Sequence, residues 1–324
     1  MRDSTDDASS TPPYGGAGPA GPGFAHPAFF YRGDREYLAG TVPFIQEGLS
    51  ASEPVAVAVP APRLALIAAE LGPAADAVHL VDMTLAGRNP GRIIPSVLRA
   101  FADARTDVRV RIVGEPVWPG RTAAEYPACV QHEALINEAF DGRDVVVLCP
   151  YDAGALPADV LDDARATHPF LVDRGRRSVS DAYDPRKVLD RCNEPLLPPP
   201  GAAVFRYDAD TLPAARDFAL AEARERATGA VRLQDLALVV AELTTNSVVH
   251  AGGGGTLRLW AQDAQIVVQV EDRGRLSDPL VGRRPARPEQ VGGRGLLLVH
   301  CLSDLVRLHT GDGGTTIRSY VACV

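Results

Sequence analysis

The sequence predicts two folded domains, an α/β domain followed by an α+β domain. The chain has 324 residues, enough for about two domains of roughly 100–200 residues each. Apolar runs of β character alternate with helical patterns up to about residue 170, which indicates βαβ units and a parallel sheet. Beyond residue 201, two long helical patterns and strands joined by short turns indicate an antiparallel or mixed sheet with helices on one face.

The domain boundaries follow from composition. Residues 1–23 are rich in Ser, Asp, Gly and Pro and cannot bury enough apolar surface to offset the entropy of ordering, so we expect a disordered tail. Residues 24–170 form the predicted first domain. Residues 171–200 are rich in Arg, Asp and Pro and end in three prolines, which indicates a stiff linker. Residues 201–324 form the predicted second domain.

Hydrophobic periodicity places the elements of each domain. Continuous apolar runs and period-two alternation, as in VRVRIV, mark strands, whereas apolar residues at intervals of three and four mark helices. In the first domain we expect strands at Pro54–Val59, His79–Asp82, Val108–Val113 and Asp144–Cys149, with helices at Arg63–Leu71, Pro90–Ala104 and Ala123–Phe140. In the second we expect strands at Ala202–Tyr207, Thr256–Ala261, Gln265–Glu271, Leu305–Thr310 and Thr315–Val321, with helices at Thr211–Thr228, Arg232–His250 and Leu296–Ser303.

Composition excludes several classes of protein. The chain is 46% hydrophobic and 23% charged, which is ordinary for a protein with a real core, and its net charge of −8 disfavours nonspecific nucleic-acid binding. No apolar run approaches the ~18 residues that a membrane span needs, and the polar, acidic N-terminus is unlike a secretory signal. Five well-separated cysteines disfavour disulfides. We therefore expect a cytoplasmic protein with no membrane or direct nucleic-acid partner.

Lysine occurs once, at Lys187. A P-loop needs a lysine directly after its glycines to reach the phosphates of a nucleotide, and DPRKVLD offers no glycine loop before Lys187. The lysine that protein kinases carry on a strand is equally hard to place. Classical P-loop phosphate chemistry is therefore excluded.

The predicted helix Arg232–His250 carries a carboxylate and a carboxamide. Glu242 and Asn246 are four residues apart, so their side chains project from the same helix face. An amide oxygen is a hard magnesium ligand, and a carboxylate can orient a nucleophile or accept its proton. A solvated Glu–Asn pair is the alternative for these two residues alone. The apolar residues of the same helix can line its core-facing side: Val239, Leu243 and Val249.

Three further motifs follow in the same domain. Asp272 ends a predicted strand, where it can accept a hydrogen bond from an exocyclic amine, and Gly274 permits close approach of a flat ring; an ordinary turn carboxylate is the alternative. Glycines before a helix start expose backbone amides that bind anions, and an arginine among them could add charge toward phosphate; a flexible loop is the alternative. These residues are Gly292, Gly293, Arg294 and Gly295. Thr316, near the start of the last strand, offers a hydroxyl.

Together these motifs resemble the GHKL (Bergerat-type) ATPase family. Glu242 and Asn246 match its N box, and Asp272 with Gly274 matches its adenine box. Residues 292–295 match the glycines of the phosphate lid, and Thr316 matches the last box. The resemblance implies a Bergerat α/β sandwich that binds ATP and magnesium.

Within that family, the phrase AELTTNSVVHA, the compact domain and the short lid look most like the anti-sigma-factor serine kinases of the RsbW type (RsbA family). The resemblance implies that Glu242 is the catalytic base, that Asn246 binds magnesium, and that Asp272 binds the adenine amine. It also implies two protein partners, a sigma factor and an anti-anti-sigma (STAS-type) protein that receives phosphate on serine, and it leaves a homodimer open. The arginine- and proline-rich lid departs from an ordinary lid.

Two rivals remain. One is an atypical sensor histidine kinase, although the segment PRKVLDRCNEPLLPPPG contains no histidine and has no room for the dimerising hairpin that carries the phosphoacceptor. His250 lies in the ATP helix itself and is expected to be structural. The other rival is a non-catalytic module in which ATP is structural and sigma binding is the whole activity. Labelling with ATP discriminates, because a histidine kinase labels itself on acid-labile histidine.

The first domain resembles the MEDS sensory domain, known from a dichloromethane-responsive regulator. The resemblance rests on the aromatic cluster after His26 and on the segments GEPVWPGR, HEALINEAF, LCPYD and THP. It implies a RecA-type α/β sheet stripped of its phosphate loop, with PVAVAVPAPR standing where that loop would follow the first strand. Such a domain senses rather than hydrolyses, and it would regulate the ATPase domain.

Polar residues at strand ends raise the hypothesis of a sensory pocket, because ligands bind at the carboxyl ends of parallel strands. Core packing and solvated side chains are the equal alternative. The residues concerned are Glu115, Trp118, Glu133, Asn137, Cys149, Tyr151 and Asp152. A metal site is disfavoured because no pair of its candidate ligands shows the close spacing of a typical zinc site; these candidates are His26, His132, Cys149 and His168.

Overall fold

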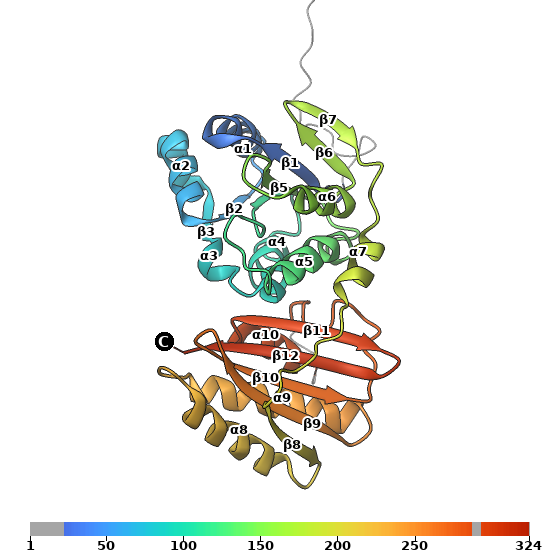
Figure 1. The fold of residues 1–324 in the computed structure, drawn as a ribbon. Coiled ribbons are helices and arrows are strands. Elements are labelled where there is room, and N and C mark those ends of the chain that lie inside the picture. Colours follow the sequence, from blue (N-terminus) through green and yellow to red (C-terminus); the bar gives the residue numbers. More distant parts are fainter. Residues whose placement is uncertain (1–22, 287–292, 324) are drawn as a thin grey trace, which may run out of the picture.

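The computed structural model describes residues 23–286 and 293–323, which form two domains, each built on its own sheet (Figure 1). The tail predicted at residues 1–23 lies outside the described residues except for Gly23, and Gly292 lies outside them as well. Across the two described ranges, no helix combines the length and apolar character needed to cross a membrane.

The first domain is built on a seven-stranded sheet in the order β3-β2-β4-β5-β1-β6-β7. Its neighbouring strands are parallel, except that β7 pairs with β6 in the antiparallel sense. The strands are β1 (Pro27–Tyr31), β2 (Val55–Val59), β3 (His79–Asp82), β4 (Val110–Gly114), β5 (Val145–Asp152), β6 (Phe170–Asp173) and β7 (Arg176–Val179). The predicted parallel α/β arrangement is therefore present.

Helices cover both faces of this sheet, as a parallel sheet requires. Phe44 of α1 and Ile67 of α2 pack on one face, whereas Leu98 of η3 and Leu135 of α5 pack on the other. The helical elements are α1 (Gly33–Ser50), α2 (Ala61–Leu71), η1 (Gly72–Ala77), α3 (Met83–Ala86), η2 (Pro90–Arg92), η3 (Ile94–Leu98), α4 (Arg99–Asp103), α5 (Tyr126–Ala139), α6 (Ala158–Thr167) and α7 (Pro185–Cys192).

The helix predicted at Pro90–Ala104 is divided into η2, η3 and α4. Pro95 lies within η3, a wide π-type turn. A proline has no backbone N–H to donate and its ring crowds the preceding turn, so a regular α-helix does not pass through this position.

Three strands of the first domain were not predicted, and two of them occupy part of the predicted linker. β1, with the sequence PAFFY, is buried along its whole length between β5 and β6. The segment PVAVAVPAPR therefore contains the second strand, β2, and the turn after it, and not the first strand. β6 and β7 lie within the predicted linker 171–200 or just before it, and α7 packs on α5 through Val188. Only about residues 193–202 connect the two domains as extended chain.

The second domain contains an antiparallel five-stranded sheet in the order β11-β12-β10-β9-β8. Each predicted element is present, with its ends displaced by no more than a few residues. The elements are β8 (Ala203–Asp208), α8 (Leu212–Arg226), α9 (Leu233–His250), β9 (Gly254–Gln262), β10 (Gln265–Asp272), α10 (Gly295–Leu302), β11 (Leu305–Gly311) and β12 (Gly314–Ala322).

Helices α8 and α9 cover one face of this second sheet (Figure 1). Val239 and Leu243 of α9 are fully buried in this core, as predicted. Val249 is 64% exposed, so its expected place in the core is wrong. It lies in the last turn of α9, where the helix extends past the edge of the packed core.

The other face of the second sheet contacts the first domain and the linker. Trp260 and Tyr320 pack on Ala128 of α5. Gln269 Nε2 donates to the carbonyl of Leu196, and an Arg318 nitrogen donates to the carbonyl of Leu197. The linker is therefore held against the sheet by hydrogen bonds to its backbone.

A second contact joins η2 to the end of α10. The side-chain amide of Asn89 donates to the carbonyls of His300 at 2.8 Å and Ser303 at 3.3 Å. A Cβ at Gly91 would overlap the imidazole of His300, so only glycine permits this approach. Leu280, from the loop after β10, is buried in the core of the first domain. The two domains thus share packed surfaces rather than only a tether.

We predict that Asn89→Ala loosens this contact. Asn89 is fully buried, and its loss leaves buried carbonyl oxygens in α10 without donors, at a cost of about 1–3 kcal/mol. Faster amide hydrogen exchange in α10 and a lower melting temperature are the expected results. Thr106→Ala, at an exposed position in the first domain, is the control. Unchanged exchange in α10 would show that Asn89 does not hold the two domains together.

Candidate functional site

The candidate site begins on α9, where Glu242 and Asn246 share one face. Gly295, the first residue of α10, lies directly against both. A Cβ at Gly295 would stand 2.5 Å from Glu242 Oε2 and 3.2 Å from Asn246 Nδ2. The predicted N-box residues and the last lid glycine are therefore brought together, and any larger residue at position 295 would displace the carboxylate or the amide.

Asp272 stands at the end of β10 and is held in a fixed orientation. Ser247 Oγ donates to Asp272 Oδ2 at 2.6 Å, and the backbone N–H of Gly274 donates to Asp272 Oδ1 at 2.9 Å. Each carboxylate oxygen keeps a further lone pair, since an ionised carboxylate can accept about four hydrogen bonds. Ser247 was not identified from the sequence, because its position beside Asn246 gives no sign that it contacts a residue on a distant strand.

The candidate site contains the hydroxyl of Thr315 and not the predicted hydroxyl of Thr316. In the β10–β12 ladder, Asp272 lies opposite Thr315, and Glu271 lies opposite Thr316. Opposite residues of an antiparallel pair share a face of the sheet, so Thr315 lies on the side of Asp272. Thr315 is 4% exposed, and its hydroxyl donates to the carbonyl of Gly274 at 2.8 Å. The structure thus places Thr315, and not Thr316, beside Asp272.

Asn246, Asp272, Gly295 and Thr315 line one cavity of about 230 Å³, and Glu242 stands beside Gly295 outside the lining. The floor of the cavity is formed by β10 and β12, and its rim by α9 and the start of α10. The lining includes Asn246, His250, Asp272, Gly274, Leu276, Gly293, Gly295, Leu296, Thr315 and Ile317. Arg294 precedes α10, is exposed and is outside this lining, and Gly292 lies outside the described residues. The helix start at Arg294 has no side-chain cap, which leaves its first backbone N–H groups for an anion.

Two protein-family models match the chain, one in each domain. The MEDS model (MEthanogen/methylotroph, DcmR Sensory domain) matches residues 25–169, and the model of the histidine kinase-like ATPase domain matches residues 205–320. The chain contains a MEDS domain and a histidine kinase-like ATPase domain. A domain of the latter, GHKL-like kind implies ATP binding, usually with magnesium.

Two other comparisons add little. Comparison with curated proteins returned no match. Among solved structures, the chain is similar to the Acinetobacter baumannii histidine kinase AdeS, at 11% identity over 37% of this chain and 67% of that chain. The TM-score is 0.23, which is too low to carry an argument.

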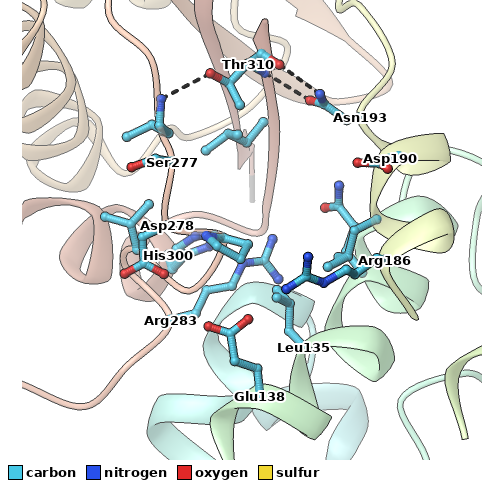
Figure 2. Close-up of a pocket in the computed structure, with 16 residues that line it drawn as sticks. Leu135, Glu138, Arg186, Asp190, Asn193, Ser277, Asp278, Arg283, His300 and Thr310 are labelled. Atoms are coloured by element: carbon cyan, nitrogen blue, oxygen red, sulfur yellow. Dashed lines mark hydrogen bonds between the residues drawn. The ribbon is translucent and has the colours of Figure 1, made fainter. Parts of the chain in front are cut away.

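A larger cavity of about 630 Å³ lies between the two domains (Figure 2). Ser277 and Asp278 of the ATPase domain line one side, while Glu138 of α5 and Arg186 of α7 line the other (Figure 2). Leu276 belongs to the lining as well. We name the 230 Å³ cavity of the ATPase domain the nucleotide cavity, after the ligand expected there. Leu276 also lines the nucleotide cavity, so both cavities border the loop after β10, which we call the lid segment (residues 273–286).

An ion pair joins the lid segment to the MEDS domain, and a second arginine lies buried near the same contact. Arg284 forms an ion pair with Glu138 of α5 at 3.4 Å. Arg283 is 5% exposed, and burial lowers the pKa of its guanidinium to about 10. A buried cation at this position belongs to the contact between domains and not to the lining of the nucleotide cavity.

The polar residues suspected of forming a sensory pocket divide into separate groups. Glu115 and Asp152 lie at the carboxyl ends of β4 and β5, whereas Glu133, Asn137 and Cys149 lie lower on the α5 face of the sheet. Trp118 packs against the core of the α5 face and stacks with Arg121, and Tyr151 packs edge-on against His168. The sequence suggested one pocket for all of these residues, but the folded sheet places them in separate groups.

Glu115 forms the centre of the group at the carboxyl ends. The hydroxyls of Tyr31 and Tyr37 donate to its carboxylate at 3.0 Å and 3.5 Å, and the Arg63 guanidinium lies over both tyrosine rings. Burial raises the pKa of Glu115 to about 8, against the opposing hydrogen bonds and the charge of Arg63, while Asp152 adds to the rise. Tyr31 and Tyr37 were not predicted as partners of Glu115, because they approach it from β1 and α1.

We predict that Asp272→Asn abolishes stabilisation by nucleotide. ATP or ADP with magnesium should raise the melting temperature of the full chain, since a ligand at 100 times its dissociation constant adds about 2.7 kcal/mol. The amide would present a donor toward Ser247 or toward an adenine amine, where the carboxylate presents only acceptors. Asp263→Asn, in the exposed β9–β10 turn, should keep the wild-type response. An Asp272→Asn variant with the full thermal shift would remove Asp272 from the site.

We predict that Glu115→Gln flattens the dependence of stability on pH. The folded state holds the Glu115 proton up to about pH 8, while the ordinary pKa is 4.5, so this contribution to stability is full below about pH 4.5 and is lost as the pH rises to about 8. The advantage of wild type over the variant should shrink across that window by on the order of a few kcal/mol.

The measurement is the melting temperature of both proteins at about pH 5.5 and about pH 8. Glu70→Gln, at an exposed position on α2, is the control and should follow wild type at both values. A wild-type and Glu115→Gln difference that stays constant with pH would contradict the raised pKa.

Proposed function

We propose that this protein is an ATP-dependent regulator in which the MEDS domain senses a signal and the ATPase domain phosphorylates a serine on a separate protein. The finer assignment is an anti-sigma factor of the RsbW type, with a STAS-type anti-anti-sigma protein as phosphate acceptor and a sigma factor as the sequestered partner. The observation that carries the proposal is the convergence of Asn246 and Asp272 on one cavity, with the carboxylate of Glu242 beside Gly295 at its edge.

The donors at this cavity fit a magnesium nucleotide. The carboxylate of Asp272 offers acceptors for an adenine amine, and the amide oxygen of Asn246 is a hard ligand for magnesium. Gly293 and Gly295 leave backbone N–H groups near the start of α10 for phosphate oxygens. Magnesium, when bound, would neutralise charge on the phosphates.

Glu242 is the residue best placed to act on an incoming hydroxyl. It lies one helical turn before Asn246, and its Oε2 stands 2.5 Å from where a Cβ at residue 295 would be. Among the described residues, it forms no ion pair with a cation. A carboxylate beside the terminal phosphate can orient a serine hydroxyl and accept its proton. General-base assistance of this kind contributes typically 10²–10⁴-fold to a rate.

The connection between the domains favours a separate acceptor protein. Between β7 and β8 the described chain contains one helix, α7, of eight residues, and α7 packs against α5 and α6. A dimerising hairpin of two long helices has no counterpart there. His250, at the end of α9, borders the nucleotide cavity and is exposed. An experiment on phosphate transfer must therefore test whether the chain phosphorylates its own histidine.

We also propose a RecA-like arrangement for the MEDS domain. β1 lies between β5 and β6, and the turn that follows it, Arg32–Asp34, holds a single glycine and no lysine. This turn stands where a phosphate loop would follow the first strand, which supports a sensing role rather than nucleotide hydrolysis.

The lid segment supports regulation of the ATPase by the MEDS domain. Leu280 is buried in the MEDS core, and Arg284 pairs with Glu138 of α5, while Leu276 borders the nucleotide cavity. A shift of α5 would therefore act directly on the segment that closes over nucleotide. Coupling between two such sites is typically about 1–3 kcal/mol.

We predict that Glu242→Ala retains nucleotide binding and loses phosphotransfer, with a rate about 10²–10⁴-fold lower. Asn246→Ala should weaken magnesium-dependent binding as well. Glu225→Ala, at an exposed position on α8, is the matched control. The acceptor is first identified by pull-down from native lysate, and transfer is then measured with labelled ATP and the purified acceptor.

Each result of that experiment has a defined meaning. Acid-stable phosphoserine on the acceptor, lost in Glu242→Ala, supports the proposal. Acid-labile phosphate on the chain itself identifies a histidine kinase, and nucleotide binding without any transfer identifies a binding module. Wild-type transfer by Glu242→Ala would assign the base to another residue.

A further inference from the structure

Four buried side chains of the MEDS domain converge beneath the centre of the first sheet: His26, Glu133, Cys149 and His168. His26 precedes β1, Cys149 lies in β5 and His168 precedes β6, and these three strands are neighbours. Glu133 reaches the same point from α5. Each residue is at most 1% exposed, and one potential ligand atom from each lies within 4.8 Å of all the others.

Hydrogen bonds fix the orientation of the first imidazole. The Asn137 amide nitrogen donates to backbone carbonyls, the shortest bond being 2.8 Å to Thr167, so the amide oxygen faces His26. That oxygen can only accept, and His26 Nδ1 therefore carries the hydrogen across the 3.2 Å between them. In the neutral ring, the lone pair of His26 Nε2 then lies 3.1 Å from Glu133 Oε2 and 3.3 Å from Cys149 Sγ.

The second imidazole is oriented in the same way. His168 Nδ1 donates to the carbonyl of Ala164 at 2.7 Å, which leaves Nε2 as the free nitrogen of the neutral ring. This buried Nε2 lies 3.1 Å from Glu133 Oε2 without a hydrogen bond, and Glu133 Oε1 also has no hydrogen-bond partner. Buried polar atoms without partners are rare and call for a group that satisfies them.

The protons available to these four side chains satisfy the hydrogen-bonding needs of the group only poorly. Two imidazole lone pairs face one carboxylate oxygen, and protonation of both rings would place two cations 4.0 Å apart between ring centroids. Among the described residues, Glu133 has ion pairs with His26 and His168 only, so no arginine or lysine neutralises it. One divalent cation at the centre would satisfy all four groups at once.

We propose that His26 Nε2, His168 Nε2, Cys149 Sγ and the Glu133 carboxylate bind one zinc ion. The mixed nitrogen, sulfur and oxygen donors suit zinc, and four protein ligands make a closed site of the structural type. Ligand bonds of about 2.0–2.3 Å in a tetrahedron separate the donors by about 3.3–3.8 Å. The donor separations of 3.1 Å and 3.3 Å lie close to that range. Binding releases the thiol proton of Cys149 to solvent.

The contacts outside the ligands support the same site. Zinc-bound histidines commonly donate their other ring N–H to a carbonyl or carboxylate, which fixes the nitrogen that binds metal. The amide oxygen of Asn137 and the carbonyl of Ala164 fill this role for His26 and His168. Sequence spacing disfavours a metal site and includes His132 among the candidate ligands. The side chain that reaches the cluster is instead that of the next residue, Glu133. The four proposed ligands come from four separate segments of the chain.

Zinc binding to the full chain tests the proposal. Protein stripped with a chelator is titrated with zinc against a chromophoric competitor, and about one ion per chain is expected at high affinity. Cys149→Ser and His168→Gln should lose more affinity than the roughly 10–100-fold that changes outside the ligand set cost, and Asn137→Ala should fall within that range. Cys129→Ser and His132→Gln, which alter a buried cysteine and histidine outside the cluster, should bind as wild type.

Cobalt provides a second readout that does not depend on variant stability. Wild-type protein loaded with Co²⁺ should show a thiolate-to-cobalt charge-transfer band in the near ultraviolet, which Cys129→Ser keeps and Cys149→Ser loses. Failure of the wild type to bind zinc or cobalt overturns the proposal, and the hydrogen-bonded network is then held by protons. Equal binding by Cys149→Ser and wild type, or a different metal in the purified protein with no zinc affinity, overturns it as well.

Discussion

Helix α5 is the element on which both domains depend, because its central part is buried between them. Every residue from Ala128 to Ile136 is buried, including three polar ones, Gln131, His132 and Glu133. One side of the helix packs on the parallel sheet, and the other contacts the ATPase sheet at Ala128. A helix enclosed in this way cannot shift without repacking both neighbours, since protein interiors are close-packed.

The contact between the domains contains buried polar side chains. His132, Arg283 and His300 each contain a buried side-chain atom without a hydrogen-bond partner. Burial lowers the pKa of His132 to about 3, which favours its neutral imidazole, and that of Arg283 to about 10, which leaves a buried cation at neutral pH. Such groups make the docked arrangement costly relative to an apolar interface, and a modest change in α5 or the lid segment can alter it.

The elements that carry the candidate nucleotide site were largely predictable, and the MEDS domain was predictable only in part. Glu242 and Asn246 are related by one helical turn, and Asp272 ends a strand marked by a run of apolar residues, so local patterns placed all three on their elements. In the MEDS domain, β1 and β6 escaped prediction because neither run shows the alternation of a half-buried strand. Their pairing with β5 and β7 becomes evident only when the sheet is assembled.

The sequence by itself determined the two-domain plan, the absence of a P-loop, and the residues that face one another within a helical turn or a hairpin. Tertiary structure decided the rest. The β10–β12 register selected Thr315 over Thr316, and Ser247 meets Asp272 across elements distant in sequence. The packing of α5 turned Glu133 toward His26. Local patterns set which face of an element is apolar, but the partners of its polar side chains depend on how separate elements pack, which no single segment encodes.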